Sequence, residues 1–308
     1  MPFFSVIIPV YNKAMFVSET LQSVLTQTFT DFEIIIINDG STDNSESVIK
    51  TLNDNRIKYF YKENEGVAIA RNLGIEKAQG EFICFLDADD FWKPTYLATF
   101  KGYIDTHPNQ KVFSCAIAIE TAKKTISAQY SLENITDFQK VDFFEASRKE
   151  CILWTSAVAI HKTVFDKIGS FDTKIKKGED TELWMRIGLQ YSIGFIGIVL
   201  AKYRYDKNSI SRNWQYFFEP YTFDKYAALE KENLKLKHYL DQNRFSAIIK
   251  CKLNGDMKTA KQLYNQIDSG QLGLRKNILI QMPGPILRLL VWAKNKAVSY
   301  GLGNSVFR

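Results

Sequence analysis

The stretch FFSVIIPVYNKAMFVSETLQSVLTQTFTDFEIIIIND, residues 3–39, decides the fold that we expect for this chain. Residues 3–10 and 32–39 are continuous apolar runs rich in β-branched side chains, whereas residues 16–27 place apolar side chains at helical spacing. Continuous apolar runs are typical of strands that are buried on both faces, as in a parallel sheet. A helix that connects two parallel strands forms a right-handed crossover. The stretch therefore predicts the first unit of a doubly wound sheet.

The same alternation continues along the chain. Residues 57–61 and 81–87 are two further strand candidates, and residues 44–53 and 66–80 have helical patterns. We expect the second of these helices to end at Gly80, as a glycine at the C-terminal end of a helix. Strands that alternate with helices predict an α/β fold, here a mostly parallel, Rossmann-like sheet flanked by helices.

The pattern changes in the second half of the chain. Residues 103–212 mix strand and helix patterns, and from about Trp214 the pattern is almost wholly helical. Within that part, we expect Gly255 to end one helix and Asp256 to cap the next. We therefore predict a domain of residues 1–215, followed by a helical C-terminal region of residues 216–308.

Composition and charge limit the compartment and the partners. The four cysteines lie far apart and form no C-x-x-C pair, which favours reduced core thiols and a cytoplasmic protein. No uncharged apolar run reaches the roughly 18–20 residues that a membrane-spanning helix needs. Residues 270–308 contain six basic residues and no acidic one, and the remaining 34 basic residues balance the 34 acidic ones. The net charge of +6 therefore belongs to the tail.

Polar side chains follow three of the expected strands. Residues 9–12 end the first strand, residues 38–43 end the second, and residues 87–90, with the sequence DADD, end the fourth. In a doubly wound sheet these ends share one edge, and open parallel sheets bind ligands beyond that edge. The three clusters together predict a ligand site there.

The residue types in these clusters exclude several kinds of site. No G-x-G-x-x-G, G-x-x-x-x-G-K-[ST] or G-x-S-x-G motif is present, and the three histidines lack metal-ligand spacing. Carboxylates suit Mg²⁺ or Mn²⁺, which proteins usually hold with one or two acids together with substrate phosphates. The acids of DADD therefore indicate a metal that carries a phosphorylated ligand. The alternative is a solvated turn in which Asp89 or Asp90 caps the next segment.

Three segments, in order and spacing, resemble the family 2 glycosyltransferases, the large inverting group with the GT-A fold. They are SVIIPVYNKAMFVSETLQSVLTQTFTDFEIIIINDGSTDNSESVI, NEGVAIARNLGIEKAQGEFICFLDADD and IGSFDTKIKKGEDTELWMRI. Together they cover about residues 3–212. The resemblance implies a metal-assisted transferase with a nucleotide-sugar donor, most often linked to uridine diphosphate (UDP).

The resemblance also implies a role for individual residues. Pro9 and Tyr11 would border the uracil, Asp39 would accept its N3–H, and Arg71 would lie near the base or the diphosphate. Asp87 would contact the ribose, with Ala88 beside it in the nucleotide-sugar site, and Asp89 would ligate Mg²⁺ or Mn²⁺. Asp180, in the sequence GED, would be the catalytic base, and attack opposite the diphosphate would invert the anomeric centre. Glu179 would orient the acceptor.

Each role has a structural alternative. Asp180 also stands where an N-cap residue or a first-turn acid would start the helix that follows it. Arg71 fits a cation on a helix surface, Tyr11 a core residue, and Glu179 a surface acid. One departure concerns the family pattern YRxH, where this chain has Asp206 after Tyr203, Arg204 and Tyr205. Asp206 would still ligate a metal, but it brings negative charge towards phosphate.

The basic tail suggests a partner. Residues 285–300 can be drawn as a helix with one apolar face (Ile286, Leu289, Leu290, Ala293, Ala297, Tyr300) and one polar face (Arg288, Asn295, Lys296, Ser299). Such a helix either lies on an anionic membrane surface or packs on the protein. Membrane anchoring fits a peripheral protein on the cytoplasmic face, a lipid-linked or glycan acceptor, and polysaccharide synthesis for the cell envelope. Nothing indicates a nucleic-acid groove.

Two other functions compete with transfer. A non-catalytic sugar-nucleotide-binding protein would use the same cleft, but it would need no base at Asp180. An aspartate-dependent phosphohydrolase would use DADD, but Phe91 follows Asp90 where that class has Thr or Val, and the role of GED is then unexplained. Turnover of a donor would discriminate among the three.

Overall fold

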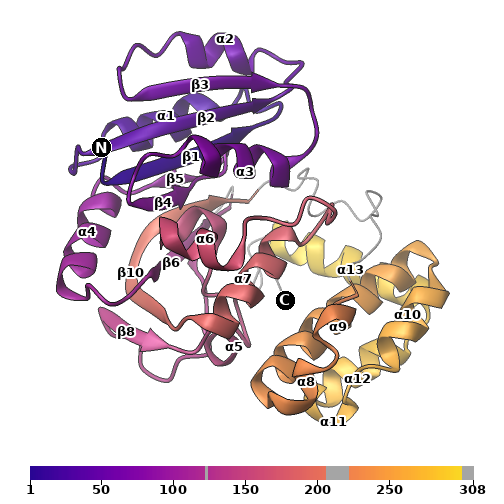
Figure 1. The fold of residues 1–308 in the computed structure, drawn as a ribbon. Coiled ribbons are helices and arrows are strands. Elements are labelled where there is room, and N and C mark those ends of the chain that lie inside the picture. The colour runs from indigo at the N-terminus through magenta and orange to yellow at the C-terminus, as the bar shows by residue number, and fades with distance from the viewer. Residues whose placement is uncertain (122–123, 206–221, 300–308) are drawn as a thin grey trace.

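The first half of the chain forms the predicted parallel sheet. The computed structural model describes residues 1–121, 124–205 and 222–299. Four strands, β1 (Phe4–Val10), β2 (Phe32–Asp39), β3 (Ile57–Lys62) and β4 (Phe82–Phe85), lie in the order β3-β2-β1-β4, and every pairing among them is parallel (Figure 1). The helices α1 (Val17–Leu25), α2 (Ser45–Lys50) and α3 (Val67–Lys77) connect them. All residues of β1 and β2 are buried, which explains their continuous apolar sequences.

The second half extends the same sheet with mixed pairing. Beyond β4 the order continues β9-β6-β10-β5, and β9 is antiparallel to both β4 and β6. The strands are β5 (Phe91–Trp92), β6 (Val112–Glu120), β7 (Thr125–Ser127), β8 (Phe138–Val141), β9 (Val158–His161) and β10 (Ile193–Arg204). The helices are α4 (Tyr96–Thr106), α5 (Phe143–Ala146), the 3₁₀ turn η1 (Thr155–Ala157), α6 (Lys162–Ile168) and α7 (Glu179–Gln190). The α/β fold is confirmed, with a sheet that is parallel in its first half and mixed overall.

Helices alone follow residue 222 in the described part of the chain. They are η2 (Asp224–Tyr226), α8 (Leu229–Glu232), α9 (Leu234–Asn254), α10 (Met257–Tyr264), α11 (Ser269–Leu272), α12 (Leu274–Gln281) and α13 (Gly284–Ser299). As predicted, Gly255 ends α9 with φ +84°, and the Asp256 side chain accepts the Thr259 N–H. No described helix is long and apolar enough to span a bilayer. The domain boundary at residue 215 stays a prediction, because it falls within residues 206–221, outside the described residues.

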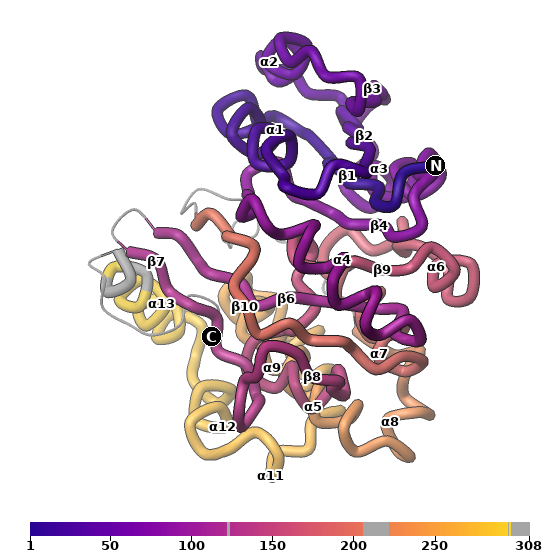
Figure 2. The backbone as a smooth tube through the Cα atoms, turned by 90° about the vertical axis from the view of Figure 1, so that its left-hand side faces the viewer, coloured from indigo at the N-terminus to yellow at the C-terminus, as the bar shows by residue number. Residues whose placement is uncertain are grey.

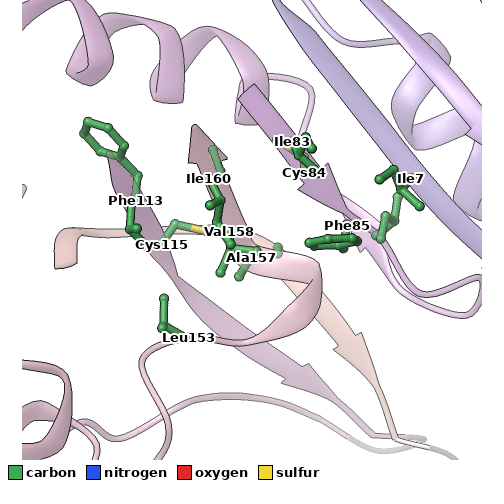
Figure 3. Close-up of a cluster of buried hydrophobic side chains, with 14 of the residues drawn as sticks. Ile7, Ile83, Cys84, Phe85, Phe113, Cys115, Leu153, Ala157, Val158 and Ile160 are labelled. Atoms are coloured by element: carbon green, nitrogen blue, oxygen red, sulfur yellow. The ribbon is translucent and has the colours of Figure 1, made fainter. Parts of the chain in front are cut away.

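Two hydrophobic cores underlie this arrangement. The larger runs through the sheet and also takes in Leu236, Tyr239 and Leu240 from the first turns of α9. Figure 3 shows part of it, with buried side chains of β4, β6 and β9 that include Cys84 and Cys115. A smaller core joins the second half of α9 to α10, α11 and α12. All four cysteines are free thiols, as expected.

Gly80 has a different role from the one predicted. Helix α3 ends at Lys77, and Ala78 after it is already extended. A side chain at Gly80 would place its Cβ 2.6 Å from the backbone nitrogen of Ser5. The glycine is therefore required by close packing against β1, and it does not end the helix.

Candidate active site

The three polar clusters meet at one edge of the sheet, as the sequence predicted. In the parallel register Val10 lies beside Asn38, and Ile7 lies beside Phe85. The residues after β1, β2 and β4 therefore leave the sheet side by side (Figure 1). A ligand beyond this edge can touch all three clusters.

The turn after β1 presents an aromatic ring to solvent. Pro9 is buried within β1, whereas Tyr11 is 42% exposed, so Tyr11 is not the core residue of the alternative interpretation. Asn12 has a left-handed φ of 53°. Its side-chain oxygen accepts the Thr42 N–H at 2.8 Å and the Asp43 N–H at 3.3 Å. These hydrogen bonds hold the turn after β1 against the turn after β2, and Tyr11 lies exposed beside them.

Asp39 connects β2 to the start of α3. It is 3% exposed, and its carboxylate accepts the Gly66 N–H at 2.9 Å, the Glu65 N–H at 3.1 Å and a proton of the Lys62 ammonium at 2.7 Å. Gly66 has φ +99°, a conformation that favours glycine. In the described structure, the oxygen that receives Gly66 has one hydrogen bond, and a carboxylate oxygen can accept two.

Arg71 is buried between two acids from distant parts of the chain. It is 4% exposed, and its guanidinium donates to Asp87 at 2.8 Å and to Glu179 at 2.9 Å. Burial alone would lower the pKa of Arg71, but the two carboxylates raise it. Arg71 is therefore not a surface cation: it joins the end of β4 to the start of α7.

The acids of DADD have separate environments. Asp87 turns to Arg71, and Asp89 forms an ion pair with Lys13, whose side chain remains 31% exposed. Burial alone would lower the pKa of Lys13, but Asp89 raises it. Ala88 between the two acids is 2% exposed. Lys13 thus supplies a positive charge at the carboxylate that was expected to bind a metal.

Asp90 belongs to the core and not to the cleft. It is 1% exposed, and its carboxyl accepts the Ser156 hydroxyl at 2.6 Å and the Arg204 N–H at 3.1 Å. Burial, together with the charges of Asp89 and Asp87, raises the pKa of Asp90 well above its ordinary value. Asp90 is thus a structural acid that ties the loop after β4 to η1 and β10.

Glu179 and Asp180 open helix α7. Gly178, with φ +89°, occupies the N-cap position. Asp180 accepts the N–H of its neighbour Thr181 at 2.6 Å, so it is an acid of the first turn and not the capping residue. Glu179 is 9% exposed, and burial and the nearby Asp180 raise its pKa, against the effect of Arg71. Glu179 is paired with Arg71, whereas the half-buried Asp180 contacts solvent and forms no ion pair in the described structure.

Two lysines near Asp180 were missed from the sequence. Lys250, on α9, is exposed, yet the surrounding protein lowers its pKa, while the charge of Asp180 acts in the opposite direction. Burial and the charge of Lys250 also lower the pKa of Lys177. Nothing in the local sequence connects Lys250 with the GED segment, because the two lie about seventy residues apart. The helical region therefore contributes positive charge to the side of the cleft where Asp180 lies.

The residues at the cleft fit a divalent cation only as partial ligands. The described residues hold no group of three or more His, Cys, Asp and Glu side chains suited to a metal. Asp87 and Asp89, with side chains 34% and 22% exposed, offer hard oxygens at the mouth of the cleft. This donor set suits Mg²⁺ or Mn²⁺ if phosphate oxygens complete the coordination. Asp206, the other possible ligand, lies outside the described residues.

Comparisons with known proteins agree with this architecture. The sequence model described as "Glycosyl transferase family 2" matches residues 5–169. An uncharacterized glycosyltransferase of Rickettsia felis is 38% identical over 203 residues, which are 65% of this chain and 32% of that protein. Another, from a Nostoc species, is 36% identical over 172 residues, covering 54% of this chain and 53% of the relative. The chain thus spans about a third to a half of the length of these two relatives.

A solved structure has a similar fold across nearly the whole chain. Residues 1–349 of TarS from S. aureus, solved in complex with UDP-GlcNAc, superpose with a TM-score of 0.69 and 19% identity. The superposition covers 99% of this chain and 93% of the TarS chain. The likeness therefore includes the helical region as well as the sheet.

Proposed function

Since the chain belongs to glycosyl transferase family 2, we propose that it is an inverting hexosyltransferase that moves a sugar from a UDP-linked donor to an acceptor hydroxyl. The observation that carries the proposal is the buried Arg71, which donates to Asp87 on the donor side and to Glu179 beside the candidate base. A single guanidinium thus holds Asp87, in the half of the site that would bind the donor, close to Glu179, in the half that would bind the acceptor. A protein that only bound the nucleotide would have no need of the second half.

The donor half is suited to a uridine nucleotide. The exposed ring of Tyr11 is placed to stack on a base, and the second lone pair of the Asp39 oxygen that receives Gly66 suits the uracil N3–H. Cytosine has no proton at that position. Support for UDP also comes from the similar TarS fold, which was solved with UDP-GlcNAc.

Asp89, with Asp87 beside it, would hold Mg²⁺ or Mn²⁺ at the diphosphate. When bound, the metal supplies positive charge that stabilises the leaving diphosphate. Lys13 pairs with Asp89 in the described structure, so it would have to release the carboxylate or share it. Its ammonium then remains within reach of the diphosphate.

Asp180 would act as the general base. Its carboxylate accepts the proton of the acceptor hydroxyl as the new bond forms on the face opposite the diphosphate. Inversion follows from that direction of attack, so an α-linked donor gives a β-linked product. Glu179, held by Arg71, would orient the acceptor or the first turn of α7. We propose a glycan or a lipid-linked glycan as the acceptor, used in polysaccharide synthesis at the cytoplasmic face of the cell envelope.

Calorimetric binding of UDP, with and without Mn²⁺, tests the donor half. We expect metal-dependent binding by the wild type that Asp89→Ala abolishes, and unchanged binding by Asp105→Ala, which removes an exposed acid on α4. Asp180→Asn should bind UDP as the wild type does, yet fail to turn over any UDP-sugar that the wild type uses. If UDP does not bind under either condition, the uridine assignment is wrong, and metal-independent binding would remove the role of Asp89.

A further inference from the structure

Helices α12 and α13 expose many of their large apolar side chains. In α12, Leu274 is 77% exposed and Ile278 is 48% exposed. In α13 the exposed large apolar residues are Ile286 at 47%, Leu289 at 63%, Leu290 at 42% and Trp292 at 59%. We call these six residues the α12–α13 surface. Figure 2 shows that the two helices lie along one margin of the molecule.

The described contacts of α13 leave this surface uncovered while holding the helix firmly. Leu287 is 2% exposed, and the Arg288 guanidinium donates to the carbonyl of Leu253, at the end of α9, at 2.7 and 3.0 Å. Gly284 lies so close to α9 that a Cβ there would come 2.7 Å from the Lys252 carbonyl oxygen. The helix is thus attached by its first turns. The predicted apolar face does not pack on the protein at Ile286, Leu289 and Leu290, whereas Tyr300 and the side chains of Asn295, Ala297 and Ser299 lie outside the described residues.

A hollow continues the surface between the two helices. It has a volume of about 520 Å³ and is lined by Asn277, Ile278, Gln281, Met282 and Pro283. None of the five residues is charged, and Ile278, Met282 and Pro283 are apolar. The hollow therefore adds to the apolar character of the surface, and Ile278 belongs to both.

The segment of chain that carries the surface has charges of one sign. Residues 269–308 contain Arg275, Lys276, Arg288, Lys294, Lys296 and Arg308 and no acidic residue. The Lys296 ammonium lies 5.0 Å from the centre of the Trp292 ring. Apolar side chains and an indole ring within a purely basic segment are the combination that binds the interface of an anionic bilayer. A second copy of the same surface would bring like charges together.

We propose that the α12–α13 surface docks on an anionic lipid membrane, with its apolar side chains inserted among the headgroups and its cations against the lipid phosphates. The surface is larger than the amphipathic helix expected from the sequence, because Leu274 and Ile278 of α12 add to it. Docking would hold the active site at the surface that carries a lipid-linked acceptor, and that consequence rests on the proposed function. The docking itself does not depend on the transfer chemistry.

Sedimentation with vesicles tests the proposal on the full chain, without donor or acceptor. The probes are vesicles of phosphatidylcholine with and without phosphatidylglycerol. We expect the wild type to bind the anionic vesicles, and less strongly at high salt. Lys294→Gln combined with Lys296→Gln should weaken binding about 30-fold, since each basic residue near the surface contributes about 1 kcal/mol. Leu289→Ser combined with Trp292→Ser should weaken it at least as much, while Met257→Ser, 55% exposed on α10, should have no effect.

Far-UV circular dichroism and urea unfolding show whether the same variants are folded, and calorimetric UDP binding is measured separately, because none of the changed residues belongs to the active site. Absence of wild-type binding to anionic vesicles would overturn the proposal, as would equal binding by the wild type and the Leu289/Trp292 variant. Self-association that this variant abolishes, without vesicle binding, would assign the surface to a second copy of the chain. A failure of UDP binding would contradict the proposed function and leave the vesicle result unaffected.

Discussion

At the scale of single residues, neighbours in the sequence serve different purposes. Asp89 faces the cleft and pairs with Lys13, whereas Asp90 is buried against Ser156 and the backbone of Arg204. The short loop after β4 turns successive side chains in different directions, and contacts from distant segments then decide the environment of each. An acid cluster in a sequence is therefore a mixture of ligands and structural residues.

Substituting the two adjacent acids separates these purposes. Asp90→Ala should lower the free energy of unfolding by about 2 kcal/mol, because it leaves the Ser156 hydroxyl and the Arg204 N–H without an acceptor in the core. Asp89→Ala, the matched control, loses only a partly exposed ion pair and should change stability by less than about 1 kcal/mol. Urea denaturation measures both. A larger loss for Asp89→Ala than for Asp90→Ala would contradict these assignments.

The sequence predicted where the site lies but not how its charges are paired. The clusters after β1, β2 and β4 could be placed together because parallel strands end at one edge. The ion pairs of Arg71 and Lys13 connect segments 16 to 108 residues apart, and no local pattern encodes such pairs. Lys250 was missed for the same reason: its helix belongs to a region that shows no active-site motif.

At the scale of elements, strands buried on both faces were the easiest to predict. Strands β1 and β2 have continuous apolar sequences because helices cover both faces of the sheet. Strand β9 is different: only four residues long, it enters between β4 and β6 in the antiparallel direction. Its neighbours are fixed by the route of the whole chain, which local periodicity does not report. The parallel half of the sheet was therefore predictable, and the order of the second half was not.

The packing of α3 on β1 makes a specific demand on one glycine. A Cβ at Gly74 would come 2.3 Å from Cγ2 of Ile7, in the middle of a fully buried strand. Gly74→Ala should therefore lower the free energy of unfolding by roughly 1–3 kcal/mol through overpacking. It should also weaken UDP binding, since α3 carries Arg71.

Gly102→Ala is the matched control within α4, where a Cβ meets nothing within 4 Å. There alanine should raise the free energy of unfolding by about 0.5–1 kcal/mol, because it reduces the backbone freedom of the unfolded chain. Thermal or urea unfolding of the two variants would show opposite signs. If Gly74→Ala proved as stable as the wild type, the close approach of α3 to β1 would not be required by the fold.

At the scale of the whole molecule, the sheet and the helical region are joined by both core and charge. The larger hydrophobic core continues into α9 through Leu236 and Leu240. Glu182 of α7 is fully buried, and its carboxylate accepts from the side chains of Arg186 and Lys225. It also accepts from the Tyr226 hydroxyl, at 3.0 Å. The last two come from the start of the helical region. Glu182 therefore attaches α7 to η2, at the start of the helical region whose helix α9 carries Lys250.

This connection should depend on pH. Burial acts to raise the pKa of Glu182, but Arg186 and Lys225 lower it below the ordinary value of 4.5. The folded state then binds fewer protons than the unfolded state, so the stabilisation is present above pH 4.5 and is lost as pH falls through the folded pKa. Glu182→Gln should lower the free energy of unfolding by about 1.5–3 kcal/mol at neutral pH, because Arg186 and Lys225 lose the charged acceptor of their hydrogen bonds.

The difference in free energy of unfolding between the wild type and Glu182→Gln should become smaller as pH falls through the folded pKa, because Glu182 itself is then protonated. Urea midpoints of the wild type and the variant, measured at neutral pH and in steps below pH 4.5, follow this convergence. Glu232 is an exposed acid on α8, so the urea midpoint of Glu232→Gln should change with pH as that of the wild type does. A constant difference between the wild type and Glu182→Gln at all pH values would mean that shape, and not charge, joins α7 to the helical region. Convergence would instead show that protonation of one buried carboxylate weakens the attachment of the region that carries Lys250.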